Sequence, residues 1–189
     1  MKKLLLVVLL LVCSLTHAAL EVAGIKYDDK TTLGAAELQL NGAGMRSRFF
    51  IKAYTIALYL PEKRTSAADV LSLKGAKRLH IVTLLELTAE KFADALVDGI
   101  HRNHSEVEAE PLKARIDEFK NAILAVKTAA KSDVITIDWL PESGTRLSVN
   151  GKQQGKDIAG EDFYRALLKI WMGSKPVQDD LKDALLGKP

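Results

Sequence analysis

The chain has very little cysteine: among its 189 residues, Cys13 is the only one. It lies in an N-terminal segment that has the character of a cleaved leader, so the mature protein would contain no thiol. Without cysteine there is no disulfide framework, no thiolate metal site and no thiol nucleophile. The absence therefore excludes disulfide-stapled modules, cysteine-ligated zinc sites and cysteine-dependent enzymes.

A strong excess of charge is also lacking. The chain has 27 Lys+Arg against 24 Asp+Glu, a formal net charge of +3. Residues 1–18 hold two of the lysines and no acid, which leaves 25 basic and 24 acidic residues in the rest of the chain. Such a balance does not favour nucleic-acid binding, and we expect no nucleic-acid partner.

Long apolar runs are absent except at the N-terminus. There Lys2-Lys3 precedes an apolar segment, Leu4 to Val12, and Thr16-His17-Ala18 precedes a cut ahead of Ala19. The segment is too short to span a bilayer, and the pattern is typical of a secretory signal peptide over residues 1–18. A lipoprotein leader acylated at Cys13 is the alternative, which the bulky preceding residue disfavours. We expect a periplasmic or secreted protein with no stable membrane anchor.

The remaining residues, 19–189, fit one domain with its own hydrophobic core. Alternating patterns predict strands over 19–27, 36–40, 49–60 and 79–85, with Asn41-Gly42 as a tight turn. Helices are expected from Thr88 and after Pro111, and further strands over 133–140 and 146–149. Two helices follow, over 163–173 and 176–186. Strands grouped apart from helices indicate an α+β layer fold.

Two arginines and a lysine interrupt the most apolar part of the chain, residues 46–60. Arg46 and Arg48 stand at its start, and Lys52 and Tyr54 lie within it. Cations on a covered face need an anion, a hydrogen bond or the rim of the sheet. Either these cations reach solvent at a strand end, or an arginine and a tyrosine bind the head of an amphipathic anion. Since Arg46 and Tyr54 are about 26 Å apart along an uninterrupted strand, the second interpretation requires the chain to turn between them.

The motifs resemble those of the chalcone isomerase-like family, in particular its exported bacterial branch. They are Gly42-Ala43-Gly44-x-Arg46, the run Phe50 to Leu60, Ile158-Ala159-Gly160, and Ile170 to Pro176. The resemblance implies an open-faced β-sandwich, with a large antiparallel sheet covered by a helical layer and a ligand cleft between them. Plant members close a chalcone to a flavanone, whereas others bind fatty acids through an arginine and a tyrosine without chemistry.

The resemblance also implies the site residues. Arg46 matches the family arginine, with Arg48 as an alternative, because the segment that follows is shorter than in the plant enzymes. The position of the catalytic threonine falls on Tyr54, or on Thr55 if the register shifts by one residue. We take these four residues as the candidate ligand-binding set.

Other positions of the plant enzyme carry side chains without donors. Its tyrosine and asparagine fall on Phe92 and Gly99, and a hydroxyl position falls on Ile170. Since each preorganised donor is worth on the order of 3 kcal/mol in a transition state, the loss favours a non-catalytic binder of a fatty acid or similar anion. An intramolecular lyase or isomerase is the alternative, and an envelope protein-interaction module is a third. No catalytic residue and no protein partner are assigned.

A metal site is not expected. His101 and His104 stand three residues apart with Glu106 and Glu108 nearby, but the spacing fixes no third ligand. The glycines at 42 and 44 lack the lysine and helix of a phosphate-binding loop and are explained by a turn or bulge. We therefore expect neither a metal nor a cofactor.

Overall fold

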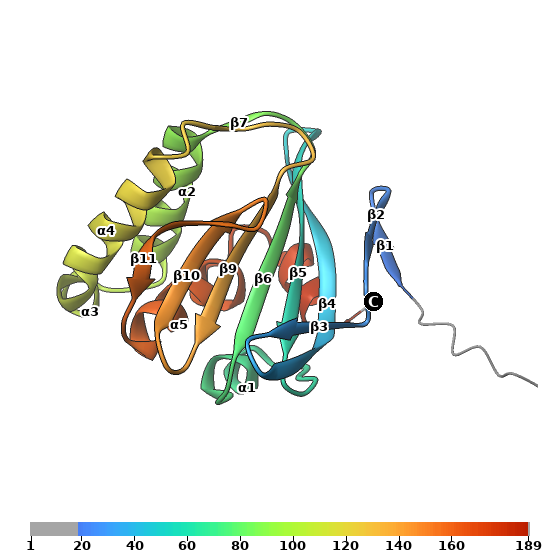
Figure 1. Cartoon of the computed structure of the whole chain (residues 1–189), viewed down its shortest axis with the longest axis horizontal. Coiled ribbons are helices and arrows are strands. Elements are labelled where there is room, and N and C mark those ends of the chain that lie inside the picture. Colours follow the sequence, from blue (N-terminus) through green and yellow to red (C-terminus); the bar gives the residue numbers. More distant parts are fainter. Residues whose placement is uncertain (1–18, 189) are drawn as a thin grey trace, which may run out of the picture.

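A seven-stranded antiparallel sheet forms the centre of the computed structural model, which describes residues 19–188 (Figure 1). The predicted signal peptide, residues 1–18, lies outside the described residues. The strand order is β11-β10-β9-β6-β5-β4-β3. The strands of this sheet are β3 (Lys30–Leu33), β4 (Ala36–Arg48), β5 (Ile51–Leu60), β6 (Lys77–Thr83), β9 (Val134–Leu140), β10 (Gly144–Val149) and β11 (Lys152–Ile158). Two small ladders join β1 (Leu20–Val22) to β2 (Ile25–Tyr27) and β7 (Leu87–Thr88) to β8 (Thr128–Ala129).

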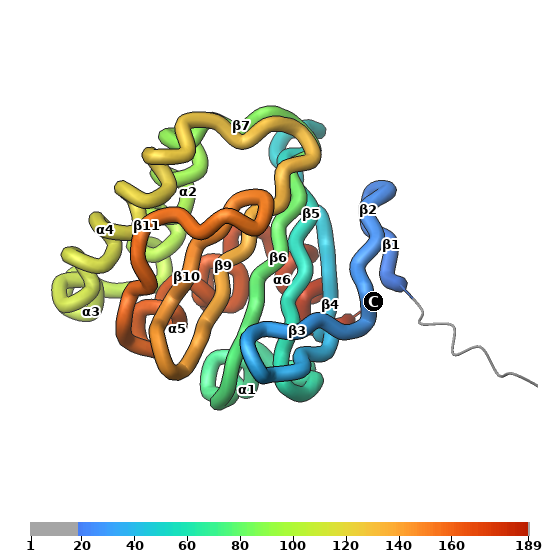
Figure 2. The backbone as a smooth tube through the Cα atoms, viewed as in Figure 1, coloured from blue at the N-terminus to red at the C-terminus, as the bar shows by residue number. Residues whose placement is uncertain are grey.

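Helices cover one face of the sheet, and the backbone trace shows α2 and α4 side by side over one end of it (Figure 2). The helices are α1 (Ala67–Ser72), α2 (Ala89–Arg102), α3 (Glu106–Ala109), the 3-10 helix η1 (Glu110–Leu112), α4 (Lys113–Leu124), α5 (Glu161–Met172) and α6 (Asp179–Leu185). The expected α+β fold, a large antiparallel sheet under a helical layer, is confirmed. None of the described helices is long and apolar enough to cross a membrane.

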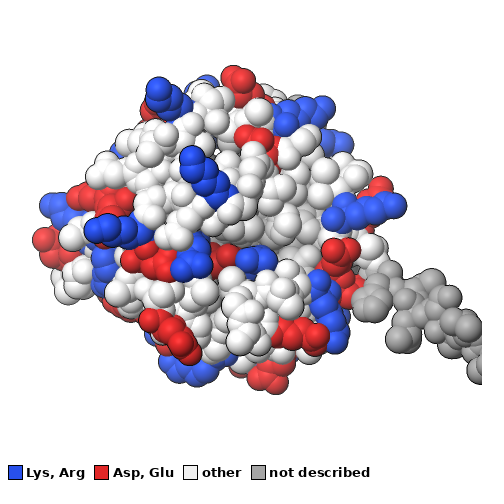
Figure 3. Space-filling model, viewed as in Figure 1, with Lys and Arg blue, Asp and Glu red and all other residues white. Residues whose placement is uncertain are grey.

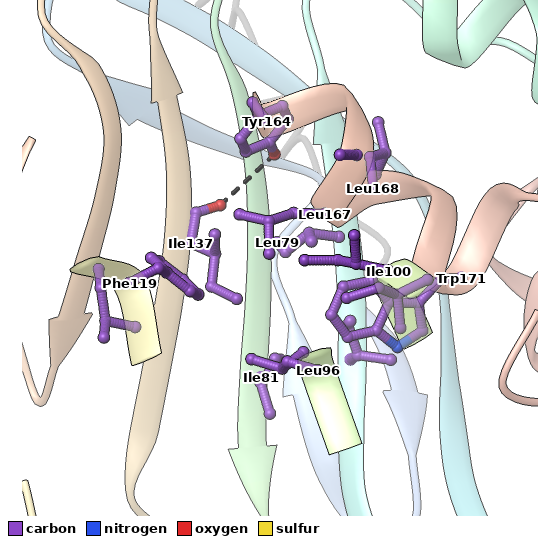
Figure 4. Close-up of a cluster of buried hydrophobic side chains, with 14 of the residues drawn as sticks. Leu79, Ile81, Leu96, Ile100, Phe119, Ile137, Tyr164, Leu167, Leu168 and Trp171 are labelled. Atoms are coloured by element: carbon purple, nitrogen blue, oxygen red, sulfur yellow. Dashed lines mark hydrogen bonds between the residues drawn. The ribbon is translucent and has the colours of Figure 1, made fainter. Parts of the chain in front are cut away.

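The main core lies between the sheet and the helices. Figure 4 shows sheet side chains such as Leu79 and Ile137 facing Leu96 of α2 and Leu167 of α5, all of them buried. Each fully buried side chain of this kind contributes about 1.5 to 3 kcal/mol. Tyr164 adds a polar contact, since its hydroxyl donates to the Ile137 carbonyl oxygen at 3.4 Å.

A smaller core covers part of the other face of the sheet. Tyr27, Leu38 and Tyr59 are buried there, with Val22 and Ile25 of the β1–β2 hairpin packed against them. Strand β5 is therefore covered on both sides, as its sequence indicates. On the face shown in Figure 3, basic and acidic side chains are intermixed.

The helix boundaries follow local sequence. Thr88 caps α2 by accepting a hydrogen bond from the backbone N–H of Lys91, as the sequence predicts. Ser105 and Glu108 form a capping box at α3, where each side chain bonds the other's backbone. Helix α5 ends at Gly173, also as expected.

The prediction of a tight turn at Asn41-Gly42 is wrong, because β4 continues to Arg48 and the chain reverses at Phe49-Phe50. The Asn41 amide instead donates to the Leu185 carbonyl at 2.7 Å and to the Arg64 carbonyl at 2.9 Å. Gly42 lies directly beneath α6, where a Cβ would come within 2.2 Å of a backbone carbonyl oxygen. These two residues serve the packing of a C-terminal helix, which local sequence does not reveal.

Three other expectations change. The strand predicted over 19–27 is a hairpin that turns at Ala23 and Gly24, both with positive φ. Strand β6 lies two residues earlier than predicted, and the last helix begins at Asp179 rather than at Pro176. The short edge strands β3 and β11 were not expected, because their residues are largely polar and exposed.

Candidate functional site

A cleft of about 1030 Å³ opens between α2 and the β4–β5 hairpin. Most of its wall is apolar: Leu96 of α2, Ile51 of β5, and Ile170 and Trp171 at the end of α5 are representative. Six side chains in the lining are charged or are histidine: Arg46, Arg48, Lys91, Asp98, His101 and Arg102. The cleft thus combines a large apolar surface with a few polar groups, as small-ligand sites commonly do.

The reversal at Phe49-Phe50 brings Arg46 and Tyr54 together. The two residues are directly paired across the β4–β5 ladder, and both line the cleft. Directly opposed residues of an antiparallel pair lie about 4.5 to 5.5 Å apart at Cα. The separation of about 26 Å along one strand therefore does not arise, and the condition for a joint site is met.

A bulge aims Tyr54 into the cleft. Arg46 pairs with Tyr54 but Ser47 pairs with Lys52, so Ala53 is an extra residue on β5. Regular alternation would send Ala53 and Tyr54 to opposite faces, yet both line the cleft. Bulges often re-aim side chains beside functional sites.

Thr55 does not belong to the cleft. Its side chain is completely buried on the other face of the sheet, where its hydroxyl oxygen lies 2.6 Å from that of Tyr27. The register shift that would have put Thr55 in place of Tyr54 does not occur, because the bulge at Ala53 fixes the alternation that follows. Thr55 is therefore corrected from a candidate ligand-binding residue to a structural one.

Tyr54 is held by a neighbour from α5. The indole N–H of Trp171 donates to the Tyr54 hydroxyl oxygen at 3.2 Å. Burial raises the pKa of Tyr54, an effect that this hydrogen bond and the charge of Arg46 oppose. The phenol is consequently neutral and keeps a proton to donate, for which residues 19–188 provide no acceptor.

The two arginines differ in how they are held. Arg46 donates through Nη1 to Gln178 Oε1 at 3.1 Å and to the Ser47 carbonyl, and it is half-buried. Gln178 also accepts from the Ser47 N–H at 2.9 Å and donates to the Met45 carbonyl at 3.2 Å. Arg48 is exposed and lies over the Phe49 ring, 5.4 Å from its centroid. Arg46 is thus a preorganised donor inside the cleft, whereas Arg48 lies at its mouth.

Helix α2 adds charge to the opposite wall. Lys91, Asp98 and Arg102 lie on one stripe of the helix together with Ala95. The cleft therefore has four Lys or Arg side chains and one carboxylate. Within the described part of the chain, none of these four cations takes part in an ion pair. Unneutralised cations at a cleft with low-dielectric walls attract anionic ligands.

The positions that the plant-enzyme resemblance assigns to donors form apolar wall here. Phe92 and Ile170 line the cleft, and Gly99 is buried against Ile170, where a Cβ would approach a side-chain carbon to 2.8 Å. No side-chain hydrogen bond can come from these three residues. The donors that line the cleft are instead Arg46, Arg48 and Tyr54 of the hairpin and Lys91, His101 and Arg102 of α2.

The two histidines considered for a metal do not converge on one point. His101 lines the cleft, whereas a ring nitrogen of His104 lies 2.8 Å from the carbonyl oxygen of Ile100. Glu108 is engaged in capping Ser105. Among residues 19–188 there is no group of three or more His, Cys, Asp or Glu side chains placed to hold a metal ion.

The family model described as chalcone isomerase-like matches residues 19–187. The chain belongs to this family. A search of curated proteins finds no match to this chalcone isomerase-like protein. Among solved structures, it is similar to a fatty-acid binding protein of Arabidopsis thaliana, with 12% identity and a TM-score of 0.66. The match covers 86% of this chain and 92% of the other, and it shows that the two proteins share the chalcone isomerase-like fold.

Sequence reasoning missed the residues that complete the site in this chalcone isomerase-like protein. Lys91 and Arg102 lie at helical spacing on α2, which is a signal the sequence contains. Gln178 left no local signal, because its role depends on β4 lying beside the start of α6.

Proposed function

We propose that this protein is an exported, non-catalytic binder of a fatty acid or a similar amphipathic anion. The observation that carries the proposal is the meeting of Arg46 and Tyr54 in an apolar cleft of about 1030 Å³. An anionic head would accept hydrogen bonds from the Arg46 guanidinium and the Tyr54 hydroxyl. Hydrogen bonds to a charged group stabilise by about 1.5 to 3 kcal/mol each.

The rest of the cleft suits an acyl chain. Its apolar wall includes Trp171, Leu96, Leu85 and Leu87. Each methylene buried there would contribute about 0.8 kcal/mol. The fold shared with a plant fatty-acid binding protein supports this ligand class.

Export is the second part of the proposal. It is supported by the leader-like residues 1–18 and by the lack of cysteine in residues 19–189, which suits an oxidising compartment. N-terminal sequencing of the protein from a periplasmic or culture fraction tests it. A mature chain that begins at Ala19 is the expected result, and an intact Met1 in the cytoplasmic fraction would contradict it.

A ring-closing isomerase is less well supported. That reaction requires several donors aimed at developing charge, and Phe92, Gly99 and Ile170 supply none. A pure protein-interaction module would not need an internal cleft. Incubation with a chalcone tests the isomerase alternative. Turnover that disappears in Arg46→Ala would show that the protein is an enzyme and would replace the binding proposal.

Direct binding is the main test. Displacement of a fluorescent fatty acid from delipidated protein gives the dissociation constant. We expect saturable binding, weakened about 10- to 100-fold in Arg46→Gln because a charged donor is lost. Arg64→Gln is the matched control, because Arg64 lies outside the cleft and bonds Glu62. Absence of saturable binding, or equal affinities for Arg46→Gln and the parent, would refute the proposal.

A further inference from the structure

The tip of the β4–β5 hairpin exposes three consecutive large apolar side chains. The exposed fraction is 81% for Phe49, 104% for Phe50 and 59% for Ile51. Single exposed apolar residues are common on soluble proteins and need no explanation. Three in a row at the end of a projecting hairpin, two of them aromatic, are unusual.

The local backbone gives no reason for aromatic residues at this place. Phe49 and Phe50 have φ of 47° and 66°. A two-residue turn with positive φ at both positions strongly favours Asn-Gly and similar pairs, and bulky residues rarely adopt it. A pair that is unfavourable for the turn and leaves both rings mostly exposed points to a role outside the folded chain.

Cations flank the tip in the sequence. Arg48 and Lys52 flank the aromatic pair on either side, and both are exposed. Lys91 and Arg102 of α2 also line the cleft. No ion pair within residues 19–188 neutralises any of these four. Aromatic side chains next to Lys and Arg are typical of segments that lie in the interface of a lipid bilayer.

We propose that this tip, Phe49 to Ile51 with Arg48 and Lys52, docks the protein reversibly on an anionic lipid bilayer. The aromatic rings would enter the headgroup region while the cations meet anionic lipid. Since Arg48, Phe49 and Ile51 also line the cleft, docking turns the mouth of the cleft towards the membrane.

A second copy of the chain is a poorer partner for the tip. Two tips that met symmetrically would bring Arg48 and Lys52 of both copies together, and like charges oppose such contact. An anionic surface removes this repulsion. The proposal goes beyond ligand binding, because attachment to a bilayer does not require an occupied cleft.

Vesicle flotation tests the proposal on purified protein. Vesicles of phosphatidylcholine alone are compared with vesicles that also contain phosphatidylglycerol. We expect flotation with the anionic vesicles, weaker with phosphatidylcholine alone and reduced by salt. The main variant is Phe49→Asn with Phe50→Gly, which removes both rings but suits the turn, so the fold is retained. Its vesicle affinity should fall at least about tenfold.

Control variants elsewhere on the protein show whether the hairpin tip is the surface that binds the bilayer. Val107→Ser removes another exposed apolar side chain, 86% exposed on α3, and should leave flotation unchanged. Lys52→Glu should lower vesicle affinity by about fivefold or more, whereas Lys152→Glu, on an exposed part of β11, should not. Absence of flotation with either vesicle would overturn the proposal, as would an Asn-Gly variant that floats like the parent.

Self-association is distinguished in the same series. If the parent is a dimer that the Asn-Gly variant abolishes, and neither protein floats, the tip is an interface between copies and the bilayer proposal is overturned. The fatty-acid titration is done without vesicles. Its outcome therefore bears on the cleft alone and is independent of docking.

Discussion

Replacing Tyr54 by phenylalanine removes the one oxygen that accepts the indole N–H of Trp171. Both residues are largely buried, with exposed fractions of 8% and 1%, so water in the cleft replaces the lost acceptor only in part. An orphaned buried donor costs about 1 to 3 kcal/mol. The donor–acceptor distance of 3.2 Å is at the long end for a hydrogen bond, which places the expected loss near 1 kcal/mol.

The loss should grow when the cleft is occupied. Without bound ligand, Tyr54→Phe should lower the melting temperature by about 2 to 4 °C, which is the shift that 1 kcal/mol produces in a chain of this size. With a carboxylate bound, the phenol would also donate to a charged acceptor, worth about 1.5 to 3 kcal/mol. We therefore expect a dissociation constant about 10- to 150-fold higher in the variant.

Tyr59→Phe is the matched control on the same strand. The Tyr59 hydroxyl donates to the Asp28 carbonyl at 3.0 Å on the opposite face of the sheet. This variant should lose a similar amount of stability in thermal unfolding and none of its ligand affinity in the fluorescent displacement assay. If Tyr54→Phe loses stability but binds the fatty acid as tightly as Tyr59→Phe does, the Tyr54 hydroxyl does not bind the anionic head.

Three further outcomes are expected. Gly42→Ala should destabilise by about 1 to 3 kcal/mol in urea unfolding, because its Cβ would lie 2.2 Å from the carbonyl oxygen of Ala184; an unchanged midpoint would show that α6 shifts freely. Asp98→Asn removes the carboxylate from the cleft and should tighten fatty-acid binding about two- to fivefold at low salt, with the gain disappearing at high salt. Glu161→Gln should lower stability by about 1 to 3 kcal/mol near neutral pH, because Glu161 is the carboxylate nearest the buried Lys77, at 3.7 Å. Burial lowers the pKa of Lys77, so this side chain loses its charge at a lower pH than an ordinary lysine does. Once Lys77 is neutral, it no longer needs the Glu161 carboxylate, and the difference in urea midpoint between Glu161→Gln and the parent should shrink in alkaline buffer. A difference that stays constant with pH would contradict this account.

Local sequence was sufficient for the elements whose ends are set by local chemistry. Thr88 predicts the start of α2 because a threonine side chain can cap a helix wherever it precedes one. Gly173 and the apolar stripe before it likewise predict the end of α5. Asn41-Gly42 misled because the same two residues that favour a tight turn also suit a bulged strand beneath a helix.

The candidate site was predictable only in its composition. Arg46 and Tyr54 are conspicuous in an apolar run, but whether they meet depends on where the chain reverses. The reversal occurs at two phenylalanines, a pair that turn preferences disfavour. The insertion of Ala53 as a bulge, which decides between Tyr54 and Thr55, depends on the pairing of β5 with β4 and is invisible in the sequence alone.

The clamp between Gln178 and Arg46 has a kinetic consequence. The Arg46 guanidinium loses its rotamer freedom when the chain folds, so this entropy is not lost again when a ligand binds. Ligands that differ only in tail length should then have similar association rates and differ mainly in their dissociation rates. Under the proposed function, acyl anions with short tails would therefore be released before those with long tails.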